Sequence, residues 1–257
     1  MKAGNIIIAV VATLLFVNCQ SEGNTGDKAA GLKSGNAAAV LPGGSQNVNF
    51  TTADGIVITG TLYPAGDKAP TVLCLHQWRS DRSSFAVLAK SLQSAGITVL
   101  AIDMRGYGGS TKSSDGKSIR PDRRAGADIQ AAMLFLRAQP SVDAARIGII
   151  GASYGSSNAI IYAADDPSVR VVVLLSPGLN YFNELPTEGP VKKYKGRPLL
   201  AVASSEDLRS VETVDAYRAV VSGIEVKLYE NAGHGTDILD AGVGLDSVIL
   251  SFLKKNL

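Results

Sequence analysis

Short apolar segments alternate with amphipathic segments along most of this chain. Residues 71–75 and 171–175 are almost entirely apolar. Such continuous runs are typical of strands that are buried on both faces, as in parallel sheets. Runs of this kind, together with a more alternating one near the C-terminus, predict strands at residues 71–75, 97–102, 146–150, 171–175, 199–203 and 224–229.

Between these strands, apolar side chains recur at helical spacing. One such set, ended by Gly96, is Phe85, Leu88, Ala89 and Leu92. The pattern predicts a second helix that opens at Pro121 and ends before Pro140, with an apolar face of Ile129, Met133 and Leu136. Alternating strands and amphipathic helices predict an α/β fold with a mostly parallel central sheet and helices on both faces.

An Asp54-Gly55 pair separates two strand-like segments at residues 48–52 and 56–63, which predicts a hairpin at the start of the domain. From Gln20 to about Gln46, small and polar residues dominate without apolar periodicity, as in a flexible tether. The sequence therefore divides into a processing segment at 1–18, a tether at 19–46 and a single domain at 47–257.

The sequence Gly151-Ala152-Ser153-Tyr154-Gly155 directly follows a predicted buried strand and precedes a helix-like segment. This G-x-S-x-G pattern in a strand-turn-helix context is typical of a nucleophile elbow. The two glycines let the chain reverse sharply around Ser153. Ser153 is therefore the candidate nucleophile.

The chain has only two histidines, His76 and His234. His234 lies in a glycine-flanked loop after the last predicted strand, where it can serve as the base that a serine nucleophile needs. The adjacent carboxylates of Glu206 and Asp207 lie between the serine and His234 in sequence, and either could orient the imidazole. The order serine, acid, histidine is the one used by α/β-hydrolases.

Four collinear motifs give the segment from about Asn47 to the C-terminus its resemblance to the α/β-hydrolase superfamily. They are Leu75-His76-Gln77-Trp78, Asp103-Met104-Arg105-Gly106-Tyr107-Gly108-Gly109-Ser110, the Ser153 elbow and Ala232-Gly233-His234-Gly235. The segment resembles most closely the branch of dienelactone hydrolases and prolyl oligopeptidases. It departs from that pattern in having serine where dienelactone hydrolases have cysteine, and Gln77 where glycine is frequent.

The resemblance implies roles for individual residues. It selects Asp207 over Glu206 as the acid, because the family places the acid three residues after the position of Ser204. It implies that the backbone N–H groups of Gln77 and Tyr154 form the oxyanion hole. It also implies structural roles for His76, Asp103 and Arg105, which shape the loops after the third and fourth strands.

Residues 178–197 occupy the place where many relatives insert a lid, and so short a segment predicts a minimal cap and an open site. Candidates to line a substrate pocket are Trp78, Tyr154, Leu179, Tyr181 and Phe182. These features predict a serine hydrolase that cleaves small or medium carboxylic esters through an acyl-enzyme. A peptidase or acyltransferase with the same triad is the alternative, and a non-catalytic binding protein of the cell envelope is the third interpretation.

The charge balance and the absence of other motifs argue against several other classes of function. With 25 basic and 23 acidic residues and no block of like charge, the chain shows no signature of nucleic-acid binding. No histidine or cysteine spacing matches a metal site, and no glycine-rich loop matches a cofactor site, so we expect neither metal nor cofactor. Cys74 lies in a predicted strand and is expected to be a buried apolar residue. The sequence leaves the natural substrate and the oligomeric state open.

The N-terminus reads as a signal peptide, because basic Lys2 precedes an apolar segment at 6–17 that is too short for the ~20 residues of a membrane-spanning helix. Cys19 follows it, in a setting that resembles a bacterial lipoprotein box. The resemblance implies cleavage before Cys19 and lipidation of its thiol. We expect a protein anchored by lipid in the bacterial cell envelope, on the periplasmic or outer-membrane side, or secreted if Cys19 is unmodified.

Overall fold

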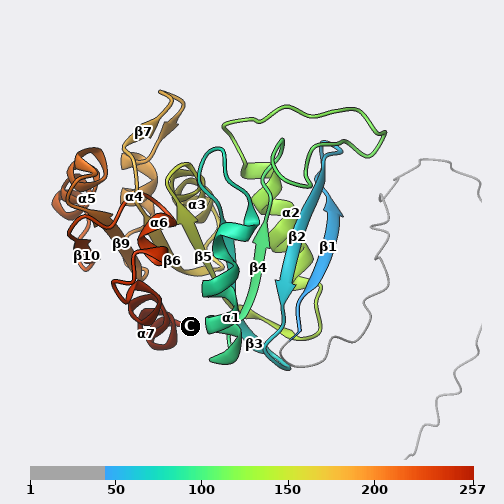
Figure 1. Ribbon diagram of the computed structural model, residues 1–257, viewed down its shortest axis with the longest axis horizontal. Coiled ribbons are helices and arrows are strands. Elements are labelled where there is room, and N and C mark those ends of the chain that lie inside the picture. The colour runs from blue at the N-terminus through green and yellow to red at the C-terminus, as the bar shows by residue number, and fades with distance from the viewer. Residues whose placement is uncertain (1–43) are drawn as a thin grey trace, which may run out of the picture. The chain divides into compact units, whose positions relative to one another are not determined.

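The computed structural model describes residues 44–257. Cys19, the predicted signal peptide and most of the predicted tether lie outside the described residues. An eight-stranded sheet with the order β1-β2-β4-β3-β5-β6-β9-β10 forms the centre of the domain (Figure 1). Its strands are β1 Gln46–Thr51, β2 Val57–Tyr63, β3 Ala69–Leu75, β4 Thr98–Ile102, β5 Val142–Ala152, β6 Val169–Leu175, β9 Leu199–Ser204 and β10 Glu225–Tyr229.

The sheet is parallel from β4 to β10. Only β2 runs against the other strands, because it is antiparallel to both of its neighbours, β1 and β4. Side chains from alternate positions of the central strands enter two separate cores. On β3, Leu73 and Leu75 join the core on one face, whereas Val72 and Cys74 join the core on the other. Burial on both faces explains why these strands are continuous apolar runs in the sequence.

Helices cover both faces, and Figure 1 shows α1 and α2 on opposite sides of the sheet. One face carries η1 Arg82–Phe85, α1 Ala86–Ser94, α6 Asp237–Asp240 and α7 Leu245–Asn256. The other carries α2 Gly126–Arg137, α3 Tyr154–Asp165, α4 Glu188–Tyr194 and α5 Leu208–Val220. A two-stranded hairpin of β7 Asn180–Tyr181 and β8 Leu185–Pro186 is the only insertion between β6 and α4 in this described part of the chain. The predicted fold class, with its minimal cap, is confirmed.

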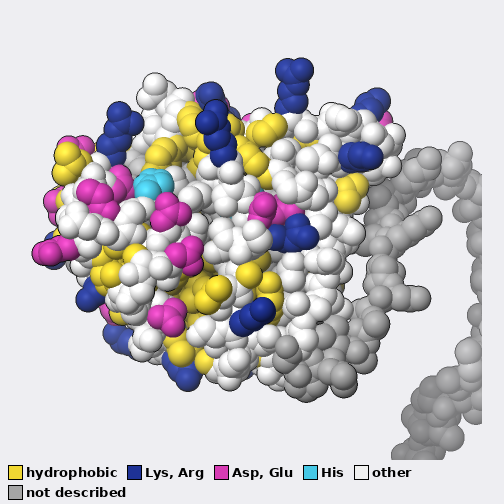
Figure 2. Space-filling view, in the orientation of Figure 1, with side chains coloured by type: hydrophobic (Ala, Val, Ile, Leu, Met, Phe, Trp, Pro, Cys, Tyr) yellow, Lys and Arg dark blue, Asp and Glu magenta, His cyan; other side chains and the backbone are white. Residues whose placement is uncertain are grey.

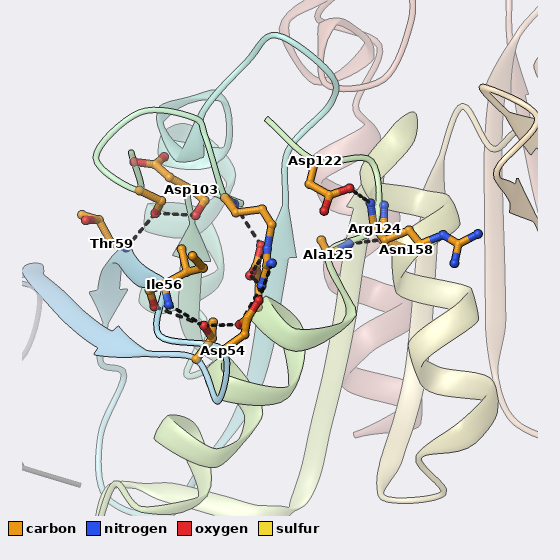
Figure 3. A network of polar contacts seen from close by, with 12 residues as sticks. Asp54, Ile56, Thr59, Asp103, Asp122, Arg124, Ala125 and Asn158 are labelled. Carbon is orange, nitrogen blue, oxygen red and sulfur yellow. Dashed lines mark hydrogen bonds and ion pairs between the residues drawn. The ribbon is translucent and has the colours of Figure 1, made fainter. Parts of the chain in front are cut away.

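The helix that we expected to open at Pro121 begins instead at Gly126. The intervening residues are held in a loop by α3, since Tyr154 Oη donates a hydrogen bond to Asp122 O at 2.9 Å. Asn158 accepts from the backbone N–H of Ala125 at 2.9 Å (Figure 3) and donates to Arg123 O at 3.2 Å. These tertiary hydrogen bonds outweigh the local preference of proline for a first helical turn.

The loops after β4 are held by two buried carboxylates, in keeping with the expected structural roles of Asp103 and Arg105. Asp103 accepts hydrogen bonds from Arg82 N at 2.8 Å and Gly109 N at 2.7 Å, and it forms an ion pair with the Arg82 guanidinium. The Arg105 side chain lies between Asp54 and Asp128, at 2.7 Å from each (Figure 3 shows Asp54 within this network). The network links the N-terminal hairpin to α2.

Replacing Asp128 by alanine is expected to lower the free energy of unfolding by about 3 kcal/mol, because it leaves a mostly buried guanidinium without its buried partner. Asp128 also accepts from the backbone N–H of Arg105 at 2.9 Å, so a second buried donor loses its acceptor. Urea denaturation measures the effect. As a control, Asp115→Ala removes an exposed pair with Lys117 and should leave the stability nearly unchanged, because solvent screens such surface pairs. Equal effects of the two substitutions would contradict this interpretation.

Among residues 44–257, no helix has the length and apolar character needed to cross a membrane.

Candidate active site

Ser153 stands at the sharp turn between β5 and α3. Its backbone has φ 51° and ψ −116°, a strained conformation for a residue with a side chain. The turn is close to neighbouring backbone, because a Cβ added at Gly155 would lie 2.3 Å from Leu75 O on β3. Glycine is therefore required at this position. The conformation holds the Ser153 side chain at the carboxyl edge of the sheet, where ligands bind in open α/β folds.

The structure brings Ser153, His234 and Asp207 together from three separate strand ends. His234 Nε2 lies 2.7 Å from Ser153 Oγ, and His234 Nδ1 lies 2.6 Å from Asp207 Oδ2. A carboxylate acceptor at Nδ1 selects the tautomer that carries its proton there, which leaves Nε2 free to accept the Ser153 proton. About two fifths of the His234 side chain is exposed. Figure 2 shows histidine at the surface beside hydrophobic and acidic side chains.

Of the two adjacent acids, Asp207 meets the imidazole and Glu206 does not. Burial tends to raise the pKa of Asp207, but hydrogen bonds from the Ser210 backbone N–H and from His234 outweigh it and lower the pKa, so the carboxyl is ionised. Glu206 instead accepts from Ser204 Oγ and from the backbone N–H of Gly233, both at 2.5 Å. These hydrogen bonds, that of Ser204 first, lower the pKa of Glu206 to about 2. Glu206 thus holds the loop that carries His234.

Gln77 occupies a position where the family often has glycine. Besides its candidate role as an oxyanion donor, it makes a side-chain contact that the sequence did not indicate. Its side-chain oxygen accepts from Thr236 N at 2.8 Å and from Thr236 Oγ1 at 3.2 Å, which ties the loop after β3 to the His234 loop. Within the described residues, the Gln77 backbone N–H has no hydrogen-bond acceptor. The Tyr154 N–H belongs to the first turn of α3, whose amides have no acceptor inside the helix. Both predicted oxyanion donors are therefore free to bind a ligand.

His76 is fully buried, and its ring nitrogens contact the loops after β3 and β4 and not Ser153. Its Nε2 accepts from Met104 N at 3.0 Å, and its Nδ1 lies 2.8 Å from Gln77 O. Burial lowers the pKa of His76, which favours the neutral ring that this pattern of hydrogen bonds requires. The side chain therefore links the loops after β3 and β4 and fixes the backbone at Gln77.

Aromatic side chains cluster beside the elbow. The Trp78 ring lies 5.3 Å from that of Tyr154 and 4.8 Å from that of Phe182, measured between centroids. Tyr107 also contacts Trp78, at 5.4 Å, although the sequence did not single it out as a pocket residue. Tyr154 is completely buried, so its ring packs behind those of Trp78 and Phe182, whereas Leu179 is 40% exposed. That these residues line a substrate pocket stays a prediction.

Two contacts connect the hairpin of β7 and β8 to the rest of the site. Arg123, from the loop before α2, stacks on the Phe182 ring at 4.8 Å and forms an ion pair with Glu184. Neither residue carried a recognisable signal in the sequence. Among the described residues, no group of three or more histidine, cysteine, aspartate or glutamate side chains could hold a metal ion.

Comparison with known proteins places the chain in a family. Residues 70–200 match the family model of the alpha/beta hydrolase fold, and the chain belongs to this family. It is 31% identical over 234 residues to an uncharacterized protein of Mycobacterium tuberculosis, a match that covers 82% of this chain and 80% of that protein.

Two further similarities concern named enzymes. The chain is 34% identical over 155 residues to a thiohydrolase of Arthrinium phaeospermum, which covers 59% of this chain and 48% of the thiohydrolase. The match thus spans about half the length of that relative. The fold is similar to that of the Pyrococcus furiosus esterase Pf2001, with a TM-score of 0.68 and 22% identity over 85% of this chain and 97% of the esterase.

Proposed function

We propose that this protein is a serine hydrolase that cleaves carboxylic esters of small or medium acyl groups. The observation that carries the proposal is the hydrogen-bonded series from Ser153 Oγ through His234 to Asp207, with distances of 2.7 and 2.6 Å. A serine hydroxyl becomes an effective nucleophile when a neighbouring base takes its proton during attack. His234 is in hydrogen-bonding reach of that proton, and Asp207 stabilises the imidazolium that results.

The reaction follows from this geometry in two halves. Ser153 Oγ attacks the ester carbonyl while His234 Nε2 takes its proton, and the backbone N–H groups of Gln77 and Tyr154 stabilise the negative charge on the carbonyl oxygen. His234 then donates the proton to the departing alcohol, which leaves an acyl-enzyme. Water, activated by His234, releases the acid and restores Ser153.

The preference for shorter acyl groups rests on the short segment beside the candidate site, which leaves little structure to enclose a long acyl chain. The segment between β6 and α4 contains one short hairpin, and its Phe182 ring packs on Trp78 beside the elbow. With p-nitrophenyl esters of increasing acyl length, we expect kcat/KM to peak at short or medium chains and to fall beyond about ten carbons. A continued rise with chain length would contradict the preference and indicate a lipid substrate.

Thioester hydrolysis or acyl transfer is the second candidate function. It is favoured by the curated relatives, which include the Arthrinium thiohydrolase and a polyketide transferase of Aspergillus fumigatus, 28% identical over 140 residues. The same triad serves either reaction, because both pass through an acyl-enzyme. Assays with a matched thioester, and product analysis with added alcohol, distinguish these reactions from simple ester hydrolysis. Lipid anchoring through Cys19 stays a prediction of the sequence alone.

A further inference from the structure

Tyr181 is held in a fixed position on the hairpin that follows β6. Its Oη donates a hydrogen bond to Ser176 O at 3.1 Å. The ring lies directly on the backbone of Gly178, where an added Cβ would be 2.6 Å from the ring carbon Cε2. Ser176 lies beside the candidate site, because its Oγ accepts a hydrogen bond from Gly235 N at 2.8 Å and the preceding Leu175 O accepts one from Ser153 N at 2.7 Å. The phenol hydroxyl, bound to Ser176 O, therefore lies close to Ser153 and to the His234 loop. Nothing in the proposed triad or oxyanion hole uses this hydroxyl.

The two sides of Ser153 differ in the groups that they present. The candidate oxyanion donor Gln77 comes from β3, on one side of β5. Asp207, His234 and the hairpin with Tyr181 follow β9, β10 and β6, all on the other side. In the proposed reaction the carbonyl oxygen turns toward Gln77, and the leaving group turns toward His234, which must protonate it. Tyr181 therefore stands on the side of the leaving group.

A second buried hydroxyl supports this position. Ser210 Oγ is buried without any hydrogen-bond partner in the described structure, which is unusual for a polar group. Ser210 follows Asp207 in the first turn of α5, and its hydroxyl adjoins that of Tyr181. A phenol oxygen accepts one hydrogen bond while its own proton is donated elsewhere. Ser210 can thus support Tyr181 Oη when the phenol turns from Ser176 O toward a ligand.

We propose that Tyr181 is a further catalytic residue, which donates a hydrogen bond to the leaving-group oxygen or sulfur during formation of the acyl-enzyme. The proposal rests on the proposed function and deepens it. When the bond between the acyl carbon and the leaving atom breaks, the electron pair goes to that atom, and His234 Nε2 supplies its proton. Tyr181 keeps its own proton and stabilises the negative charge that develops. Burial raises the pKa of the Tyr181 phenol, in keeping with this role.

The test compares two esters of one acid in the full-length chain and in its Tyr181→Phe variant. Ethyl butyrate has an alkoxide leaving group that needs protonation, whereas p-nitrophenyl butyrate releases a phenolate that leaves as an anion. The ratio kcat/KM reports on acylation, the step that Tyr181 assists. We expect Tyr181→Phe to lower kcat/KM about 10- to 100-fold for the ethyl ester, since a hydrogen bond to a charged group is lost. For the p-nitrophenyl ester we expect a loss of less than about twofold.

Tyr194→Phe is the matched control, because Tyr194 Oη also donates to a backbone carbonyl, Pro198 O, at 3.1 Å but belongs to α4. It should leave both rates unchanged. Equal losses for the two esters in Tyr181→Phe would show that Tyr181 only supports the loop, and no loss for either would show that it has no role. Both results overturn the proposal. Activity that survives in Ser153→Ala would instead overturn the proposed function itself.

Discussion

Substitution of Ser153 by alanine is expected to lower kcat for ester hydrolysis by about 10⁵- to 10⁶-fold, to the level that binding and the oxyanion donors alone support. The loss is so large because no acyl-enzyme can form without the Ser153 hydroxyl. Hydrolysis of p-nitrophenyl butyrate, followed in the purified full-length chain and the variant, measures it. The fold should be retained, since the alanine side chain has room wherever the serine side chain fits.

Ser157→Ala provides the matched control. Ser157 lies in α3, directly after the elbow, is also buried, and donates only a long hydrogen bond of 3.4 Å to Gly178 O. We expect its activity to stay within about twofold of the wild type. If Ser153→Ala kept substantial activity while Ser157→Ala lost it, the assignment of the nucleophile would be wrong.

Substitution of Asp207 by asparagine is expected to lower kcat by about 10⁴-fold. An amide at this position removes the negative charge that stabilises the imidazolium, and its N–H₂ group favours the wrong His234 tautomer. The loss should appear with little change in thermal stability, because asparagine nearly matches aspartate in volume. Steady-state kinetics and a melting curve of the same preparation measure both quantities.

Glu206→Gln tests the choice between the two acids. Glu206 touches Ser204 and Gly233 and has no contact with the imidazole, so we expect a loss of activity of about tenfold or less, through the position of the His234 loop. A larger loss in Glu206→Gln than in Asp207→Asn would reverse the assignment of the acid.

The parts of this molecule that follow from local pattern could be predicted from the sequence. A strand buried on both faces requires an apolar side chain at nearly every position, so the run ending at Ile150 identified the strand before Ser153. Likewise, Gly155 could be recognised from the sequence, because this turn brings its backbone so close to β3 that a side chain would collide with Leu75 O. The chain has only two histidines, and His76 ends a buried strand, so the sequence left His234 as the candidate general base.

The features that could not be predicted from the sequence depend on contacts between distant segments of the chain. The start of α2 was misplaced because Asn158 and Tyr154, on another helix, hold the loop before it. The hydrogen bond that the Gln77 side chain accepts from Thr236 joins two residues that are far apart in the sequence. The buried state of Tyr154 and the contact between Tyr107 and Trp78 arise in the same way. Local periodicity carries no information on such pairs.

The most direct test of the central claim is covalent labelling of the full-length chain with a fluorophosphonate, followed by peptide mapping in a mass spectrometer. Such reagents phosphonylate a serine only when a base activates it. We predict one equivalent of adduct, on the peptide that contains Ser153, and no adduct in Ser153→Ala or after denaturation. An unlabelled wild-type chain, or an adduct on another serine, would contradict the claim that Ser153 is an activated nucleophile.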